Sequence, residues 1–246
     1  MMPPHCRLLP YRAADGAWNM AADETLLASA LGGLASFRLY GWSQPTLSLG
    51  YFQPSAASRV DPNLQPLAWV RRPTGGEALV HHYELTYALA LPPGFPWQRR
   101  GESWLCHLHG ILADALASFG ILASTCGQNE ERKLGNVLCF LHHTPGDLRI
   151  GDAKIAGSAQ RKQRGALLQH GGVLLAASPH APRVRGIREL TGSTLSPESL
   201  GHAIVEQLRY RTNWSLTPTE WSLQDRQHIE ELVVTKYTHP AWNEKR

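Results

Sequence analysis

Cysteine is scarce in this sequence, and its spacing is not that of a metal or redox site. No two cysteines form a Cys-x-x-Cys pair, which excludes a zinc knuckle and a thioredoxin-type redox site. The amino-terminal residues lack the long apolar core of a secretory signal, so we expect reduced thiols in a cytoplasmic protein. The four thiols in 246 residues are Cys6, Cys106, Cys126 and Cys139.

Long hydrophobic runs, strongly charged tracts and nucleotide-binding loops are also lacking. No apolar run is long enough to span a bilayer, which predicts no membrane partner. The net charge is only +4 and the densest basic cluster is the short segment 183–188, so we expect no nucleic-acid partner. A mild positive balance does suit an acidic protein partner. P-loop and Rossmann glycine motifs are absent, so any nucleotide would have to bind by another route.

Histidine is plentiful, but its spacing does not predict a metal site. There is no i, i+4 histidine pair with an intervening glutamate, and no Cys/His cluster has the spacing of a zinc site. We therefore predict no bound metal. The histidines weighed as ligands are His81, His82, His107, His109, His142, His143 and His170.

Amphipathic helices and paired strands make up most of the chain. Hydrophobic residues account for 43% of it, which is enough for a substantial core. Apolar spacing with start and stop signals predicts helices over 16–33, 103–120, 196–210 and 217–237. Strand patterns lie at 36–42, 46–52, 67–92, 147–160 and 165–177, the third and fourth each with a turn.

The order of these elements indicates the fold class. The strands come in neighbouring pairs rather than in regular β-α-β alternation, which favours an α+β fold. We expect a mixed, largely antiparallel sheet flanked by helices. No repeat, low-complexity tract or obvious linker divides the chain, so we predict one domain over residues 1–246.

A polar turn interrupts the apolar stretch VRRPTGGEALVHH at residues 70–82. Gly75 and Gly76 let a ligand approach the backbone, and the charges of Arg71 and Arg72 suit a carboxylate or phosphate. His81 can donate a hydrogen bond or exchange a proton. On residue types alone, a surface hairpin with its arginines in solvent is favoured, because Gly-Gly turns between strands are common.

Two candidate reactive side chains, Cys139 and Lys154, lie fifteen positions apart. A lysine beside a thiol stabilises the thiolate and can exchange a proton. The simpler interpretations are an inert buried thiol and an edge-strand lysine that extends to solvent. The residues near Lys154 interleave polar groups with small ones that leave room for a narrow ligand: Gly157, Ser158, Ala159, Gln169, His170 and Gly171.

Five segments, in order, resemble the superfamily of lipoate-protein ligase A and the LipM-type octanoyltransferases, to which biotin-protein ligases are related. They cover almost the whole chain and lie at residues 19–27, 45–53, 71–87, 154–175 and 236–246. Residues 71–87 are similar to the family's Arg-Arg-x-Ser/Thr-Gly-Gly loop, and residues 154–175 to its lysine-bearing strands. The resemblance implies a mixed sheet with flanking helices and a groove for an acyl group.

The resemblance also implies a reaction. Octanoyltransferases take octanoate from acyl carrier protein onto a cysteine and pass it to the lysine of a lipoyl domain. A closely related amidotransferase, which would take an octanoyl or lipoyl group from a lipoyl protein, is also implied. Cys139 resembles that cysteine, and Lys154 is expected to polarise the thioester carbonyl. No cofactor is expected, and the acceptors would be the glycine cleavage H protein and the 2-oxoacid dehydrogenase E2 component. The substrate-binding residues so implied are Arg71, Arg72, Thr74, Gly75, Gly76, His81, Gly157, Ser158, Ala159, Gln169, His170 and Gly171.

Roles within this set follow the same resemblance. Arg71 and Arg72 are expected to orient the phosphopantetheine or the acidic carrier surface, while the Gly75-Gly76 turn and His81 shape the acyl pocket. The first alternative is an ATP- and Mg²⁺-dependent lipoate-protein ligase, in which Lys154 binds the adenylate and Cys139 is incidental.

Two features disfavour that ligase. It commonly carries an additional carboxy-terminal domain, which we do not expect here, and a carboxylate at Glu77 repels a nucleotide phosphate. His82 and the loop after Cys139 depart from the family pattern. A non-catalytic acyl-binding homologue is the alternative from another class.

Overall fold

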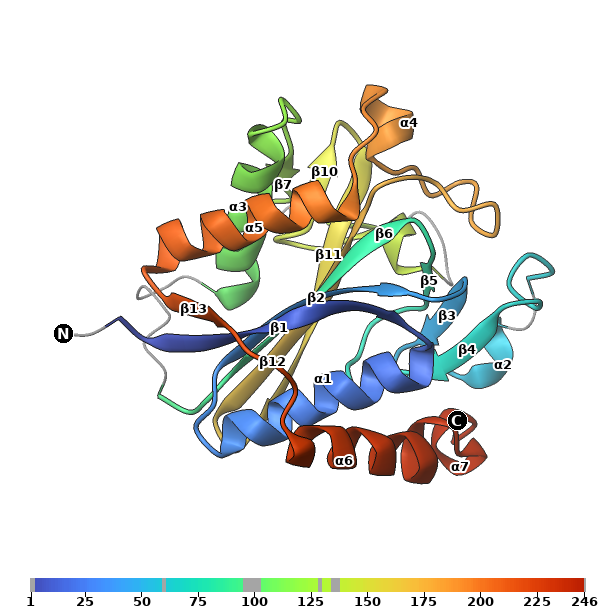
Figure 1. Cartoon of the computed structure of the whole chain (residues 1–246). Coiled ribbons are helices and arrows are strands. Elements are labelled where there is room, and N and C mark those ends of the chain that lie inside the picture. The colour runs from blue at the N-terminus through green and yellow to red at the C-terminus, as the bar shows by residue number, and fades with distance from the viewer. Residues whose placement is uncertain (1–2, 59–60, 95–102, 128–129, 134–137, 246) are drawn as a thin grey trace.

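An eight-stranded mixed sheet forms the centre of the molecule (Figure 1). The computed structural model describes residues 3–58, 61–94, 103–127, 130–133 and 138–245. β1 pairs in parallel with β13 and β2, and the other neighbours pair antiparallel, as the predicted α+β fold requires. In spatial order the strands are β13 (Ser215–Pro218), β1 (His5–Ala14), β2 (Ser36–Trp42), β6 (Glu84–Leu91), β12 (Ala166–Leu174), β11 (Ala153–Gln163), β10 (Leu148–Ile150) and β7 (Ser124–Thr125).

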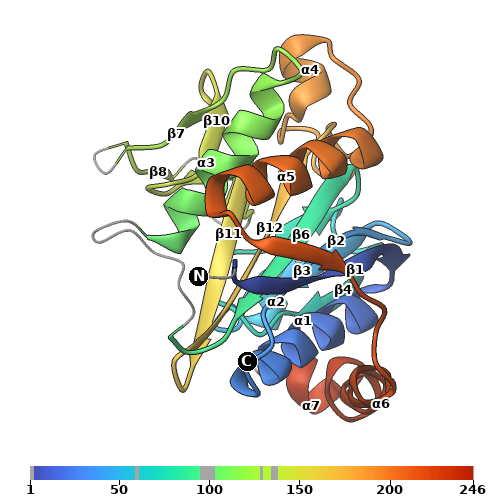
Figure 2. The ribbon, with the colours of Figure 1, turned by 60° about the vertical axis from the view of Figure 1, so that its left-hand side comes forward.

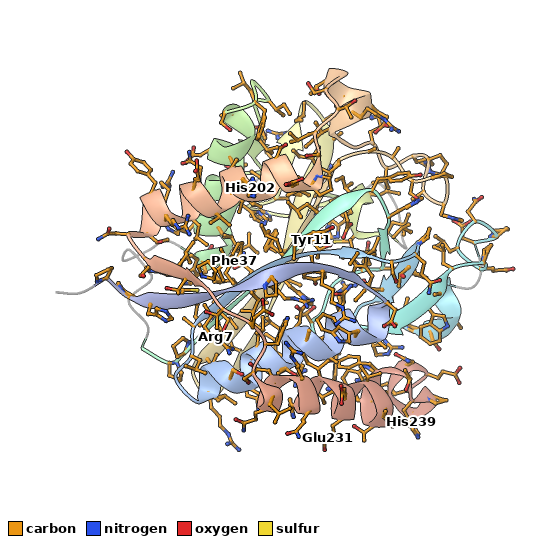
Figure 3. All side chains as sticks on the ribbon, viewed as in Figure 1. Arg7, Tyr11, Phe37, His202, Glu231 and His239 are labelled. Atoms are coloured by element: carbon orange, nitrogen blue, oxygen red, sulfur yellow. The ribbon has the colours of Figure 1, made fainter. Side chains whose placement is uncertain are left out.

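Helices cover both faces of this sheet. α3 (Trp104–Ala117) and α5 (Pro197–Thr212) lie on one face, and α1 (Gly16–Leu31) and α6 (Leu223–Leu232) on the other (Figures 1 and 2). The central strand β6 is therefore buried along its whole length. Figure 3 labels Phe37, which is buried in the core beneath α3 and α5, and the exposed His202 and Glu231 on the outer helices.

A second sheet of three strands packs beside the first. β3 (Thr46–Leu49) lies between β4 (Ala68–Arg71), which is parallel to it, and β5 (Leu79–His81), which is antiparallel. The segment 70–82 was predicted as strand, turn, strand, but its two strands pair with β3 and not with each other. Pairing with a third strand satisfies the backbone groups that a simple hairpin would pair internally.

The carboxy-terminal region differs from the prediction of one helix over 217–237. Residues 215–218 instead extend the large sheet beside β1. The helix begins after Ser222, whose hydroxyl accepts a hydrogen bond from the N–H of Asp225, and the Asp225 carboxylate accepts one from the N–H of Ser222. This reciprocal cap fixes the start of α6.

Short elements complete the chain. They are α2 (Ser55–Ser58), β8 (Arg132–Lys133), the 3₁₀ turn η1 (Cys139–Leu141), β9 (His142–His143), α4 (Ile187–Thr191), the π-helical turn η2 (Val233–Tyr237) and α7 (Pro240–Asn243). Of the helices that the structure describes, none has the length and apolar character needed to cross a bilayer.

Candidate active site

A largely apolar cavity of about 460 Å³ lies between the two sheets. Its volume falls within the roughly 300–1,000 Å³ of small-molecule pockets. Strands β2, β6, β11 and β12 of the large sheet contribute to its walls, and so do β3, β5, the 72–77 loop and η1. The predicted site residues that line it are Arg72, Gly75, Gly76, His81, Cys139, Lys154, Gly157, Ser158, Ala159, His170 and Gly171.

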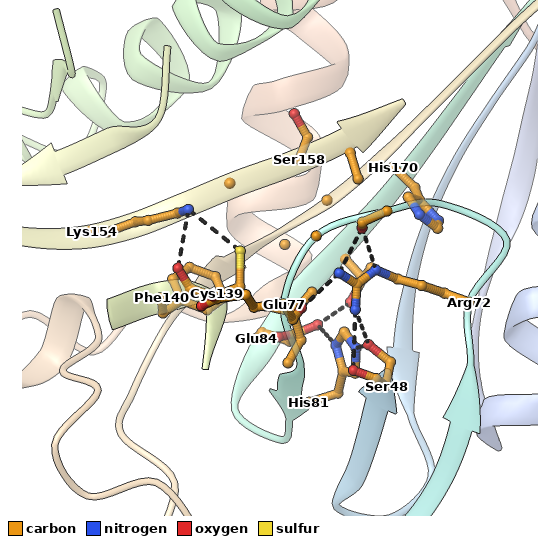
Figure 4. A pocket seen from close by; sticks show the side chains of 18 of the residues that line it. Ser48, Arg72, Glu77, His81, Glu84, Cys139, Phe140, Lys154, Ser158 and His170 are labelled. Carbon is orange, nitrogen blue, oxygen red and sulfur yellow. Dashed lines mark hydrogen bonds and ion pairs between the residues drawn. The ribbon is translucent and has the colours of Figure 1, made fainter. Parts of the chain in front are cut away.

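Cys139 and Lys154 meet at one wall of this cavity (Figure 4). The Nζ of Lys154 lies 3.7 Å from the Sγ of Cys139 and 3.1 Å from the carbonyl oxygen of His142. The N–H of Cys139 donates to the carbonyl of Ala78 at 2.8 Å, which ties η1 to the start of β5. A half-buried thiol beside a buried ammonium is the setting in which a cysteine acts as a nucleophile.

Arg72 shapes the glycine turn rather than extending into solvent. The residue is 2% exposed, and its guanidinium donates to the carbonyls of Ser48, Gly75 and Glu77 (Figure 4). Burial lowers the pKa of Arg72 to about 10, so the side chain stays cationic at neutral pH. Gly76 needs its glycine, because its φ is +94°. The loop is thus closed around a fixed buried charge.

Arg71 lies outside the cavity, contrary to its predicted role towards a carrier or its cofactor arm. The side chain is fully buried, and its guanidinium donates to the carbonyls of Gly50, Gln53 and Asn243. The N–H of Arg71 also donates to the Asn243 side chain. Because both arginines are buried among backbone carbonyls, the interpretation of a solvent-exposed hairpin is wrong as well.

His81 and a glutamate that the sequence reasoning missed form a polar strip along the cavity wall. The Nδ1 of His81 lies 2.7 Å from the carboxylate of Glu84, and its Nε2 lies 2.7 Å from the hydroxyl of Ser48 (Figure 4). The ring of Trp42 stacks on His81 at 3.8 Å, and its Nε1 donates to Thr86. Stacking and hydrogen bonds hold the imidazole in one orientation.

His170 connects the opposite wall to the glycine turn. Its Nδ1 lies 2.7 Å from the Asp23 carboxylate on α1, and its Nε2 lies 2.7 Å from the hydroxyl of Thr74. Asp23 also accepts from Arg38 and Tyr40. His170 thus connects the Asp23 carboxylate to the hydroxyl of Thr74 through its two ring nitrogens. Thr74 therefore acts behind the cavity wall, through His170.

Gln169 also lies behind the wall. It is fully buried, and its side-chain amide donates to the hydroxyl of Ser158 at 3.3 Å. That hydroxyl lies 2.9 Å from the Nε2 of His109 on α3. Burial lowers the pKa of His109, so its imidazole is neutral. The hydroxyl of Ser158 is thus held towards α3, and the residue offers the cavity its backbone side.

Comparison with known proteins identifies the family of the chain that forms this cavity. A family model described as the lipoyl protein ligase A/B catalytic domain matches residues 15–209. The chain belongs to this family. Curated relatives named octanoyltransferase LipM include those of Kyrpidia tusciae, 32% identical over 96% of this chain and 97% of the relative, and of Bacillus subtilis, 31% identical over 95% of each.

Solved structures agree on the fold. Lipoate-protein ligase A bound with ATP superimposes with a TM-score of 0.78 at 19% identity, covering 98% of both chains. A bipartite lipoate protein ligase of Thermoplasma acidophilum gives 0.74 at 17% identity, covering 99% of this chain and 97% of that one. In this lipoyl ligase A/B chain, the cavity and its loop therefore lie within a fold shared with lipoate ligases.

Several residues that hold the lipoyl ligase A/B site together carried no local signal in the sequence. Asp23 contacts a partner 147 positions away, and Asn243 contacts one 172 positions away. His109 gave the clearest available hint, because a histidine lies on the apolar face of the 103–120 helix pattern. A buried histidine there requires hydrogen-bond partners.

Gly157 gives the site a test of geometry. A Cβ at this residue would lie 2.6 Å from the Cε of Lys154 and 2.9 Å from its Nζ. Gly157→Ala is expected to displace the ammonium and reduce acyl transfer about a hundredfold, while the fold persists because a flexible chain end can move. Transfer rates and thermal unfolding check this.

Gly110→Ala is the matched control. On α3 the added methyl group would come no closer than 3.7 Å to any heavy atom beyond the adjacent backbone of its own helix, so activity should be unchanged. Wild-type transfer by Gly157→Ala would show that the Lys154 position has no bearing on the reaction.

Proposed function

We propose that this chain is an octanoyltransferase of protein lipoylation. It would take an octanoyl group from acyl carrier protein, hold it as a thioester on Cys139 and pass it to the lysine of a lipoyl domain. The observation that carries the proposal is the 3.7 Å approach of Lys154 Nζ to Cys139 Sγ at the wall of an apolar cavity. The curated octanoyltransferase relatives, similar over nearly their whole length, support it.

The first half-reaction moves the acyl group between two sulfurs. The Sγ of Cys139 attacks the donor's thioester carbonyl, and a new carbon–sulfur bond forms. The donor carbon–sulfur bond then breaks, and the donor sulfur leaves as a thiol with the proton that Cys139 gave up. A thioester is already activated, so this step requires no nucleotide.

The second half-reaction makes an amide. The neutral ε-amine of the lipoyl-domain lysine attacks the Cys139 thioester, a carbon–nitrogen bond forms, and the bond to Sγ breaks. The proton lost by the amine returns to the sulfur. In both steps negative charge develops on the carbonyl oxygen, and the nearby ammonium of Lys154 stabilises it.

Partners follow from the two substrates. The T. acidophilum ligase of similar fold is described together with its E2 lipoyl domain as one lipoylation system, which supports a lipoyl domain as acceptor here. The acceptors that we propose are two proteins with lipoyl domains, the 2-oxoacid dehydrogenase E2 component and the glycine cleavage H protein. The net charge of +4 suits acidic donors and acceptors, and acyl carrier protein is the donor we propose.

The decisive experiment is incubation with octanoyl-acyl carrier protein in the absence of ATP, followed by intact mass measurement. We expect an octanoyl adduct on the wild-type chain that is lost in Cys139→Ser. Adding a lipoyl domain should move the octanoyl group onto that domain. Cys106→Ser is the matched control, because Cys106 is an exposed thiol outside the cavity and its loss should change neither step.

Other outcomes would replace the proposal. Modification of a lipoyl domain by free lipoate and ATP, undiminished in Cys139→Ser, would establish a ligase. Binding of octanoate without transfer under either condition would establish a non-catalytic acyl-binding protein.

A further inference from the structure

A buried carboxylate lies directly behind the Cys139–Lys154 contact. The Oδ2 of Asp147 is 2.7 Å from the Nζ of Lys154, and the two side chains are 4% and 2% exposed. The same oxygen accepts hydrogen bonds from the N–H of Thr144 at 2.7 Å and from its hydroxyl at 2.9 Å. Three donors therefore hold this oxygen in one position beside Lys154.

The surrounding backbone is built to hold this carboxylate in place. Asp147 immediately precedes β10, and its carbonyl accepts from the N–H of Cys126 at 2.7 Å. Across the strand pair, a side chain at Gly157 would approach the Oδ1 of Asp147 to 3.2 Å, in addition to its clash with Lys154. The absence of a side chain at residue 157 thus leaves room for both members of the ion pair.

The charge of Asp147 matters most when Cys139 is acylated. A lysine buried in an apolar setting tends to lose its proton, unless an anion lies beside it. A Cys139 thiolate is such an anion, but octanoylation converts it to a neutral thioester. Asp147 remains, so an anion stays in contact with Lys154 throughout the cycle.

We propose, on the basis of the octanoyltransferase function above, that Asp147 is a positioning residue that keeps Lys154 a permanent cation through both half-reactions. The ion pair holds the Lys154 ammonium beside the reacting carbonyl. In net terms, a proton passes from Cys139 to the departing donor sulfur in the first half-reaction and from the acceptor amine back to Cys139 in the second, so each half-reaction balances.

The other titratable groups described around the pair do not replace Asp147 as the anion that contacts Lys154. Burial keeps His109 neutral and raises the pKa of Cys126, which holds Cys126 as a thiol. The cation of Arg149 pairs with Glu130. In the part of the chain that the structure describes, other groups near the pair include Tyr87, whose pKa is raised by burial, the Arg72 cation bonded to the glycine turn, and His142 and Glu77 on the cavity wall.

The first test measures how the reactivity of Cys139 depends on pH. Iodoacetamide alkylation of Cys139 is followed by peptide mass in the full chain, with Cys106→Ser as the background. Asp147→Asn removes a negative charge from a coupled pair, which makes its first deprotonation easier. The midpoint of alkylation is therefore expected to move down by about one pH unit.

Two further variants make this test specific. Asp152→Asn removes the same charge from the neighbouring β10–β11 turn, where the carboxylate is 79% exposed and pairs with Arg185, and should leave the midpoint unchanged. Asp147→Ser removes the buried charge with a smaller side chain, should Asp147→Asn fail to fold. An unchanged or raised midpoint in a folded Asp147 variant would overturn the proposal.

The second test isolates the amide-forming step. Octanoylated enzyme is prepared, mixed with a lipoyl domain, and followed through one turnover from mildly acidic to alkaline pH. The ratio of the Asp147→Asn rate to the wild-type rate cancels the titration of the acceptor lysine. This rate ratio should be near one at acidic pH. It should fall about tenfold at higher pH, where Lys154 of the variant loses its proton while Lys154 of the wild type keeps it.

A ratio that stays constant with pH would indicate a merely structural role for Asp147 and would contradict the proposal. If the wild-type chain forms no octanoyl adduct, the proposed function fails. The alkylation midpoint still tests the Asp147–Lys154 coupling, because that measurement requires no acyl transfer.

Discussion

Lys154→Met is expected to slow both half-reactions by about a thousandfold, which corresponds to roughly 4 kcal/mol of transition-state stabilisation. The methionine fills the space of the lysine stem but places no positive charge within reach of the developing oxyanion. Single-turnover formation and loss of the octanoyl adduct on Cys139 measure the two steps separately. A reduction in only one of them would mean that the ammonium serves one transition state.

The same substitution carries a cost in stability that must be separated from the chemistry. Without Lys154, the Asp147 carboxylate stays buried without its cation, and breaking such a pair costs about 3–5 kcal/mol. Lys154→Met combined with Asp147→Asn removes both charges and should recover most of the free energy of unfolding. It should not recover the rate. Recovery of transfer in the double variant would show that Lys154 acts only by supporting the fold.

Local patterns predicted the large sheet and its helices better than they predicted the segment 70–82. Alternation and helix caps mark β6 and α5 from nearby residues alone. The pairing of β4 with β3 is parallel and joins residues more than twenty positions apart. No local turn sequence therefore predicts it. The same holds for β13, which joins the amino-terminal strand only in the folded chain.

The two reactive groups were predicted from their chemistry, whereas their support was not. Cys139 and Lys154 are residue types whose combination indicates thiol chemistry, and the fold brings them to 3.7 Å. Asp147 reads locally as a polar residue before a strand, and only the close approach of β10 and β11 reveals its pairing with Lys154. The sequence shows that residue 147 is acidic, but it does not show which basic residue pairs with it.

Glu77 links the sequence argument to the choice of reaction. Its side chain lines the same cavity as Lys154 and Cys139. A carboxylate at this wall disfavours a nucleotide phosphate in the cavity, as Coulomb repulsion in a partly buried site is strong. An uncharged octanoyl chain meets no such repulsion, which is consistent with thioester exchange as the proposed reaction.

Arg71→Met is expected to lower the free energy of unfolding by about 4 kcal/mol, because it leaves several buried carbonyls without a donor. The guanidinium joins the carbonyls of Gly50 and Gln53 to that of Asn243 on α7. Equilibrium unfolding in urea measures the loss. Arg12→Met is the control: Arg12 is exposed and stacks on Trp18 at 4.2 Å, an interaction worth only about 0.5–1 kcal/mol.

Arg71→Lys discriminates charge from geometry at this position. A lysine retains the cation but has a single donor group in place of a planar fork, so it cannot serve carbonyls on both sides. Most of the lost stability should therefore persist. Since Arg71 directly precedes the Arg72 glycine turn, the variant should also weaken octanoyl transfer, although Arg71 touches no part of the cavity. Full stability and activity in Arg71→Lys would mean that the charge alone holds α7 against the loop.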